Sequence, residues 1–395
     1  MTKIQIPEDS IKKILEIAYL TVFSGLLIYS FLNTTMFQIQ WSENFLPYMR
    51  ILLLTCILLR MCYSERYSIW EMIICAGLFV VFAVVFKRNG FDEVLNTALL
   101  IMGARGISFK KIVKIYFVIS LILLLITIAA ALTGHIENLV YMQEGRNIRI
   151  AFGCNYPTDF SAHILYIVLA YAYLRKEKIS YFELLVIGGL GVFVYIFCQA
   201  RLNSICLEII MFAFGGYKIW HKKCTKKKRI PFGWKISTIL SAVPVLCAGG
   251  MIICSMLFSS NNKFLVLLDR VLSYRLRLGK KGIDLYGLSY LGQWIPMQGN
   301  GGTVKEQVNY FFLDSSYLYV LLQYGILVLM IILGAMLIIN YRAYLNRDFV
   351  LILTLCIVAI QCMVEHHLMD LAYNPFLWAL LADLTVRKVQ GKSSI

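Results

Sequence analysis

Residues 115–132 read IYFVISLILLLITIAAAL, a run of eighteen residues without a charged side chain. The hydrocarbon core of a bilayer is about 30 Å thick, and a helix that rises about 1.5 Å per residue needs roughly 20 mostly apolar residues to cross it. Residues 236–258 and 317–339 form similar uncharged runs. These stretches predict transmembrane helices and set the fold class.

The composition of the whole chain agrees with that class. Of the 395 residues, 59% are apolar and only 15% are charged, whereas soluble domains hold about 45–50% apolar and about 25% charged residues. The mean hydropathy is +0.72. Transmembrane barrels alternate apolar and polar residues in segments of about ten, and this sequence does not. It therefore predicts an all-α, polytopic membrane helix bundle that forms one domain over residues 1–395.

Twelve apolar stretches are candidate membrane spans. They cover residues 14–31, 45–59, 70–86, 94–102, 115–132, 160–174, 181–198, 205–220, 236–258, 317–339, 349–364 and 372–381. The fourth and the last are too short to cross about 30 Å of hydrocarbon by themselves. They need flanking residues, or one of them is re-entrant, so a count of 10–12 spans stays open.

The basic residues predict the orientation, because Lys and Arg accumulate on the cytoplasmic side of membrane proteins. With both termini cytoplasmic, the inner segments hold about 25 of the 38 Lys and Arg residues. The segment 218–235 is then a basic cytoplasmic loop, and residues 259–312 form a long extracytoplasmic loop. The sequence thus predicts a multi-pass membrane protein with both termini in the cytoplasm, and the bilayer is its first partner.

Several classes of function find no support in the sequence. The net charge of +16 mostly reflects the inner-face bias, so no nucleic-acid partner is implied. The chain contains no G-x-x-x-x-G-K-[ST] loop for nucleotide phosphates. It also has no C-x-x-C pair, and no D-x-D cluster of the kind that holds Mg²⁺. We therefore expect no metal and no other cofactor.

The extracytoplasmic loop is basic although it lies on the side where Lys and Arg are normally scarce. Residues 264–278 carry apolar side chains at helical spacing, which predicts an amphipathic helix on the outer leaflet. Arg275 and Arg277 belong to this stretch. Their position suggests an anionic ligand on the outer side.

On this topology most of the unusual polar residues converge on the outer face. Those we expect to bind a phosphate are Arg149, Arg201, Arg275 and Arg277. Those we expect to act as a base are Asp314, His366 and His367, and those with a supporting role are Tyr317, Glu365, Asp370 and Asn374.

Two of these residues have an equally simple structural explanation. Arg201 lies in a very short turn between two spans, so it either contacts a ligand or extends its guanidinium to the membrane interface. Asp314 precedes an expected helix at Ser315 and is a natural N-cap. If it caps that helix, His366 or His367 is the next candidate base, because imidazoles titrate near neutral pH.

The combination points to one kind of chemistry. Arginine forks match the oxygens of a diphosphate, and a base can take the proton of an attacking hydroxyl. Together they suit transfer of a sugar from a diphosphate to a hydroxyl group, with the arginines neutralising the leaving group.

Five stretches resemble the polytopic polymerases that join lipid-linked repeat units into capsular polysaccharide or O-antigen (Wzy-type), within the O-antigen ligase superfamily. They are RIAFGCNYPTDFSAHILYIVLAY (149–171), FCQARLNSICLEI (197–209), LSYRLRLGKKGIDLYGLSYLGQ (272–293), FFLDSSYLYVLLQYGIL (311–327) and EHHLMDLAYNPFLWALL (365–381). The likeness covers residues 90–385 in order and spacing. Ala200, Tyr274 and the Tyr156-Pro157-Thr158 triplet depart from the family pattern.

The resemblance implies a glycosyltransferase-C-like bundle in a bacterial cell (inner) membrane. Such an enzyme takes a glycan from undecaprenyl diphosphate and passes it to another lipid-linked unit. It implies that Arg201 and Arg275 contact the diphosphate, that Arg149 is the first-half arginine, and that Asp314 stands where ligases carry a histidine base. A chain-length regulator and a flippase of the same pathway would be further partners.

Three alternatives remain beside a polymerase. One of them, a sensor or structural scaffold, would not need arginines in three separate outer turns. A ligase uses the same donor with a different acceptor, but the family's ligases carry His where this chain has Asp314. A flippase or other transporter should place ionisable groups near the midplane and at both mouths. Here the expected cluster lies at one mouth.

Overall fold

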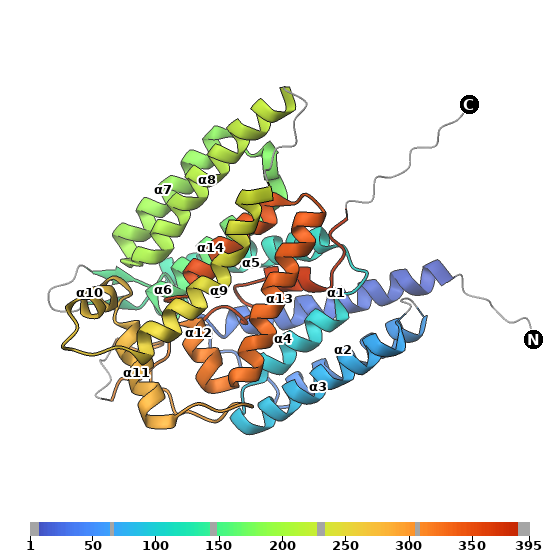
Figure 1. Cartoon of the computed structure of the whole chain (residues 1–395), viewed down its shortest axis with the longest axis horizontal. Coiled ribbons are helices and arrows are strands. Elements are labelled where there is room, and N and C mark those ends of the chain that lie inside the picture. Colours follow the sequence, from blue (N-terminus) through green and yellow to red (C-terminus); the bar gives the residue numbers. More distant parts are fainter. Residues whose placement is uncertain (1–7, 64–66, 143–147, 227–233, 305–308, 386–395) are drawn as a thin grey trace, which may run out of the picture.

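The computed structural model describes residues 8–63, 67–142, 148–226, 234–304 and 309–385, and it is almost entirely helical (Figure 1). Eight helices within these ranges are long and apolar enough to cross a membrane. They are α1 (Glu8–Leu32), α2 (Phe45–Tyr63), α3 (Ile69–Asn89), α5 (Phe109–Leu132), α7 (Tyr181–Cys198), α8 (Arg201–Lys226), α9 (Trp234–Met256) and α13 (Ile326–Leu345). The prediction of an all-α bundle is thus confirmed. By length and composition these eight helices are candidate membrane spans, fewer than the 10–12 expected.

The remaining elements are shorter or more deeply buried. The further helices are α4 (Asp92–Gly103), α6 (Pro157–Arg175), α10 (Lys263–Val271), α11 (Arg275–Tyr286), α12 (Ser316–Tyr319) and α14 (Phe349–Gln361). The structure also contains three short helical turns. Two are 3₁₀ turns, η1 (Lys176–Lys178) and η3 (Phe376–Leu380), and one is a π-helical turn, η2 (Val320–Tyr324). A two-residue antiparallel pair joins β1 (Val140–Tyr141) to β2 (Arg149–Ile150).

The expected last span, 372–381, is not a transmembrane helix. Its only regular structure is the five-residue turn η3, and Trp378 at its centre is fully buried. Arg342 of α13 donates to the carbonyl oxygens of Ala379 (2.6 Å) and Ala382 (2.8 Å), so the backbone is satisfied without a continuous helix. The apolar character of this segment therefore reflects burial inside the protein and not contact with lipid.

The expected span 317–339 is broken near its start. The chain forms α12 and η2, turns at Gly325, and only then enters α13. Gly325 has φ +93°, and the N–H groups of Ile326 and Leu327 donate to the carbonyls of Ser289 (2.9 Å) and Tyr290 (3.1 Å). The loop before α12 thus satisfies the first free N–H groups of α13, which is why the helix can restart inside an apolar segment.

The predicted amphipathic helix at 264–278 is two helices. Ser273 (φ +54°) and Tyr274 (φ +69°) break it between α10 and α11, because residues in the left-handed region cannot continue a helix. In α10 the side chains of Phe264, Leu267 and Val271 share one exposed face, while Leu265 is buried. Its exposed apolar stripe still fits a helix that lies at a membrane surface.

The segments between the helices gather at two opposite ends of the bundle. One end, the terminal end, brings the start of α1, the α4–α5 turn and residues 383–385 together. Glu16 pairs with Lys111 at 2.6 Å, and the N–H group of Asp383 donates to Ile107 at 2.7 Å. The α6 end joins the α13–α14 turn there through Lys176 and Asp348, which lie 2.7 Å apart.

The other end, the loop end, holds the described parts of the long segment 257–315 and the residues that contact them. The N–H group of Met36 donates to Gly153 at 2.8 Å, and the hydroxyl of Tyr141 donates to Asn300 at 3.1 Å. In Figure 1, α10 and α11 lie on the left and the start of α1 on the right. Segments that the sequence assigned to one side of the membrane thus lie at one end of the molecule.

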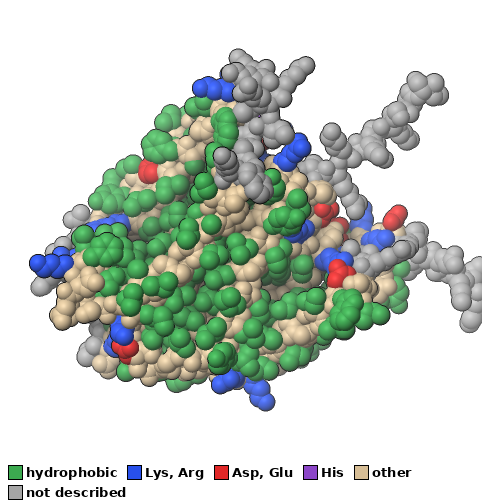
Figure 2. Space-filling model, viewed as in Figure 1, with side chains coloured by type: hydrophobic (Ala, Val, Ile, Leu, Met, Phe, Trp, Pro, Cys, Tyr) green, Lys and Arg blue, Asp and Glu red, His purple; other side chains and the backbone are tan. Residues whose placement is uncertain are grey.

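Apolar side chains cover the surface between the two ends. Figure 2 shows them over most of one face, with Lys and Arg confined largely to its margins. Exposed examples lie on four different spanning helices, such as Trp70 (76%), Leu125 (57%), Phe182 (75%) and Phe212 (71%). An apolar face of this extent would associate in water, so it fits contact with lipid.

We expect residues 259–312 to lie outside the cell and the basic segment 218–235 to lie inside. Of the latter, residues up to Lys226 continue α8, and 227–233 lie outside the described residues. Alkaline phosphatase fused after Gln298 should be active, and the same reporter fused after Thr225 should be inactive. The reverse pattern would place the loop end in the cytoplasm and contradict the orientation.

Candidate functional site

The loop end contains a buried ion pair between α11 and the segment before α12. Arg275 Nη1 lies 2.8 Å from the Asp314 carboxylate, and both side chains are 15% exposed. Arg275 also donates from Nε to the carbonyl of Val364 at 3.2 Å. One guanidinium thus connects three segments far apart in sequence. It is fixed in orientation, as a phosphate-binding arginine should be.

Asp314 is not the helix cap that its sequence position suggested. The N-cap residue of α12 is Ser315. The N–H group of the first helical residue, Ser316, donates to the carbonyls of Cys362 (3.0 Å) and Glu365 (3.2 Å), which belong to another segment. The Asp314 carboxylate instead accepts from the Tyr310 hydroxyl at 3.2 Å. The capping explanation for Asp314 is therefore wrong.

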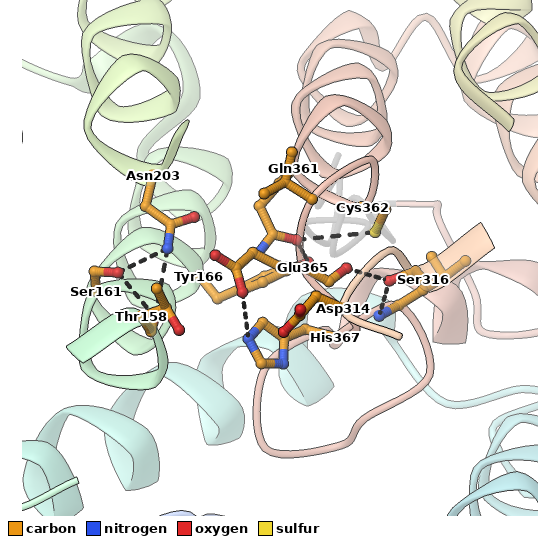
Figure 3. A network of polar contacts seen from close by, with 12 residues as sticks. Thr158, Ser161, Tyr166, Asn203, Asp314, Ser316, Gln361, Cys362, Glu365 and His367 are labelled. Atoms are coloured by element: carbon orange, nitrogen blue, oxygen red, sulfur yellow. Dashed lines mark hydrogen bonds and ion pairs between the residues drawn. The ribbon is translucent and has the colours of Figure 1, made fainter. Parts of the chain in front are cut away.

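Glu365 lies directly beside this ion pair. Its side chain is 6% exposed, and Oε2 lies 3.8 Å from Nε2 of the fully buried His367. Figure 3 shows the two side chains facing each other, with Asp314 and Ser316 next to them. Burial raises the pKa of Glu365 to about 8, although the positive charge of Arg275 opposes the rise.

Arg149 is held by other segments of the chain than Arg275. It is buried in β2, donates from Nε to the carbonyl of Cys198 at 3.1 Å, and donates from Nη1 to the Tyr156 hydroxyl at 3.1 Å. Its charge is close enough to lower the pKa of Glu365, against the effect of burial. Two of the four predicted arginines, Arg149 and Arg275, thus lie within electrostatic range of the same carboxylate.

The two histidines form the edge of an aromatic stack. The ring of His366 lies 4.6 Å from that of His367, which stacks on Tyr373 at 3.7 Å, and Tyr373 stacks on His163 at 4.3 Å. Burial lowers the pKa of His366 and of His367 below the ordinary value of a histidine. Both are therefore neutral imidazoles at neutral pH, and neither is a strong base.

Three of the expected supporting residues hold the backbone of the site. The Tyr317 hydroxyl donates to Ala359 at 2.8 Å, and the Asn374 amide donates to Leu368 at 2.7 Å. Asp370 accepts from the N–H group of Ala372 at 2.8 Å, and burial raises its pKa to about 6. These contacts explain why the segment after α14 keeps a fixed, non-helical path.

The other two predicted arginines do not join the site. Arg277 pairs with the buried Asp269 at 2.7 Å and lies over the ring of Tyr274. Asp269 also accepts the N–H groups of Leu276 and Arg277, so this pair fixes the start of α11. Arg201 begins α8 as an exposed residue, and the described part of the chain gives it no ion pair.

The sequence did not single out Tyr310, Asp159 or His163 as site residues. Tyr310 is four residues before Asp314, and its position gave no periodic signal because residues 309–315 are not helical. Asp159 lies in the first turn of α6, close enough to interact electrostatically with Asp314 and Glu365. A polar residue in an otherwise apolar span was the only available hint for His163.

Within the described ranges, no group of three or more His, Cys, Asp or Glu side chains is arranged to hold a metal ion. The site is built from arginine–carboxylate pairs, tyrosines and neutral histidines. Such a set can bind an anion, accept a proton and hydrogen-bond hydroxyl groups. Comparison of the chain with protein-family models, with curated proteins and with solved structures finds no significant match.

Proposed function

We propose that this protein is an extracytoplasmic glycosyltransferase of a bacterial inner membrane. It polymerises oligosaccharide repeat units linked to undecaprenyl diphosphate into a capsular polysaccharide or O-antigen. The observation that carries the proposal is that two arginines held in fixed orientations at the loop end, Arg149 and Arg275, both interact electrostatically with the Glu365 carboxylate. The motif resemblance of residues 149–381 supports the same substrate class.

In this proposal the two buried arginines bind the diphosphate of the donor. When the bond from the anomeric carbon to the phosphate oxygen breaks, negative charge develops on the leaving diphosphate. Arg275 is already oriented by Val364 and Asp314, so it needs little reorganisation to stabilise that charge. Arg149 is held in the same way by Cys198 and Tyr156.

The location of the site favours an enzyme over a transporter. A transporter requires ionisable groups that are reached from both sides of the membrane. Arg149, Arg275 and Glu365 lie at the loop end, among segments that the sequence assigns to the outer side. The remaining apolar segments, including α4 and the buried 372–381 segment, would complete a glycosyltransferase-C-like bundle with both termini inside.

The direct test is to delete the gene and analyse the lipid-linked glycans and the surface polymer. We expect single lipid-linked repeat units to accumulate and long polymer to disappear, with recovery when the wild-type gene is returned. The purified protein should then lengthen repeat units extracted from the deletion strain.

Each alternative gives a different result in the same experiment. If full-length polymer accumulates on the lipid carrier and fails only to reach its final acceptor, the protein is a ligase. If the single units accumulate but remain inaccessible from outside, it is a flippase. Normal polymer in the deletion strain would contradict all three assignments.

A further inference from the structure

Glu365 has unused hydrogen-bonding capacity although it is buried. Its carboxylate oxygens accept no hydrogen bond from the described residues, and the contact with His367 Nε2 at 3.8 Å is longer than a hydrogen bond. Buried carboxylates normally have partners, and one without them is unusual. Such a group is available to a ligand that brings its own hydroxyl.

His367 shows the same feature. It is fully buried, and within the described structure neither ring nitrogen has a hydrogen-bond partner. Stacking on Tyr373 fixes the plane of its ring, so Nε2 faces Glu365 (Figure 3). A buried imidazole without partners is costly for stability, and this one lies beside a carboxylate that accepts no hydrogen bond from the described residues. The missing hydrogen-bond partners are explained if the substrate supplies them when it binds.

Asp314, by contrast, is already engaged. Arg275 at 2.8 Å and the Tyr310 hydroxyl at 3.2 Å both bind its carboxylate. Taking up a proton would remove the negative charge that pairs with Arg275. Both contacts commit the Asp314 carboxylate to partners within the protein. Its geometry suits the orientation of Arg275 better than proton transfer.

We infer that Glu365, and not Asp314, accepts the proton of the acceptor hydroxyl, and that His367 is a positioning residue that orients the Glu365 carboxylate. The inference rests on the proposed function and names the group that completes its chemistry. Hydrogen bonds at catalytic sites are often long in the free enzyme and tighten once substrate is bound. The 3.8 Å separation is consistent with that behaviour.

Atoms and electrons balance in the proposed step. The acceptor hydroxyl oxygen forms a bond to the anomeric carbon of the donor while the bond from that carbon to the diphosphate oxygen breaks. The hydroxyl proton passes to an oxygen of Glu365, and the electron pair of the broken bond leaves with the diphosphate. Arg275 and Arg149 balance the charge of the leaving group, and water removes the proton from Glu365 after the product departs.

The step also predicts a pH dependence, because Glu365 must be ionised to act as a base. The titratable and charged groups that face it come from several elements: Arg149 of β2, Asp159 of α6, Cys206 of α8, Arg275 of α11, Asp314, and His367 of its own segment. With a free-enzyme pKa of about 8 for Glu365, kcat/KM should rise with pH and level off above that value.

The test uses full-length protein in detergent, with lipid-linked repeat units extracted from the deletion strain as donor and acceptor. Glu365→Gln keeps the shape of the side chain but cannot take a proton. We expect it to bind the donor as the wild type does and to lower the rate of transfer by on the order of 100-fold or more. The rise of the residual rate with pH should also disappear.

Three further variants keep the test decisive. Glu365→Asp retains a carboxylate base and should recover part of the transfer rate. His367→Phe removes the positioning residue, so it should lower kcat and alter the pH profile while KM stays near the wild-type value. Asp284→Asn, which changes an exposed carboxylate of α11, should behave as the wild type. Wild-type transfer rates in Glu365→Gln would overturn the inference, whereas a wild-type protein that extends no donor would overturn the proposed function instead.

Discussion

Arg275→Ala should lower the rate of polymer synthesis by on the order of 100-fold, because one fixed donor to a developing negative charge contributes about that much. The Arg275 side chain contacts both Asp314 and the backbone of Val364. Arg275→Lys should restore little of the rate, since an ammonium group cannot hold those two partners and a phosphate in the same plane. The measurement is chain length and rate in cells and with purified protein.

Loss of folding must be separated from loss of chemistry in these variants, because removing Arg275 leaves Asp314 as a buried charge without its partner. Arg270→Ala is the matched control, since Arg270 lies five residues away in the same segment and is exposed. It should keep wild-type abundance and activity. If Arg275→Ala elutes as a monodisperse protein in detergent and still builds full-length polymer, Arg275 does not bind the donor.

Gly325→Ala should unfold the loop end, with a loss of about 3 kcal/mol or more in stability. Gly325 has φ +93°, and a Cβ atom there would overlap the backbone nitrogen of Gly292 and lie 2.7 Å from the carbonyl oxygen of Tyr290. Gly292 is equally constrained, because its own Cβ would lie 2.6 Å from the carbonyl oxygen of Gln323. Two backbones cross here at a distance that only glycine permits.

The thermal midpoint of the protein in detergent measures this effect. Gly334→Ala is the control in the same helix, because no atom lies within 4 Å of a Cβ atom placed there and its φ is not positive. That variant should be neutral or slightly stabilising, since alanine favours a helix over glycine. A thermal midpoint for Gly325→Ala equal to that of Gly334→Ala would show that the loop does not press against α13.

The sequence predicted the helices that face lipid because their signal is local. A charge-free run such as 115–132 can only be accommodated as a helix in a bilayer, and it appears as α5, Phe109–Leu132. The same reasoning failed at 372–381. This segment is also apolar, but its apolar side chains are buried within the protein and do not face lipid. It also missed the break at Gly325, because the partner that permits the break, residues 289–292, comes from a distant part of the chain.

The sequence alone determined that the protein is an all-α bundle with long apolar helices, and it predicted which segments gather at one end of the molecule. Composition and the charge distribution fix these properties, because each helix must satisfy its own backbone in lipid. The tertiary structure decided which polar residues meet. It pairs Arg275 with Asp314 and directs Arg277 to Asp269, although the two arginines are close neighbours on the same helix.

The physical reason is that spacing along one helix does not specify what lies opposite each side chain. The carboxylate that meets Arg275 is 39 positions later, and the one that Arg149 approaches, Glu365, follows α14. Such long-range contacts depend on how the loop end folds over the bundle. That packing also leaves both ring nitrogens of the buried His367 without a hydrogen-bond partner among the described residues, with Glu365 3.8 Å away. No local pattern in the sequence encodes this property of the assembled structure.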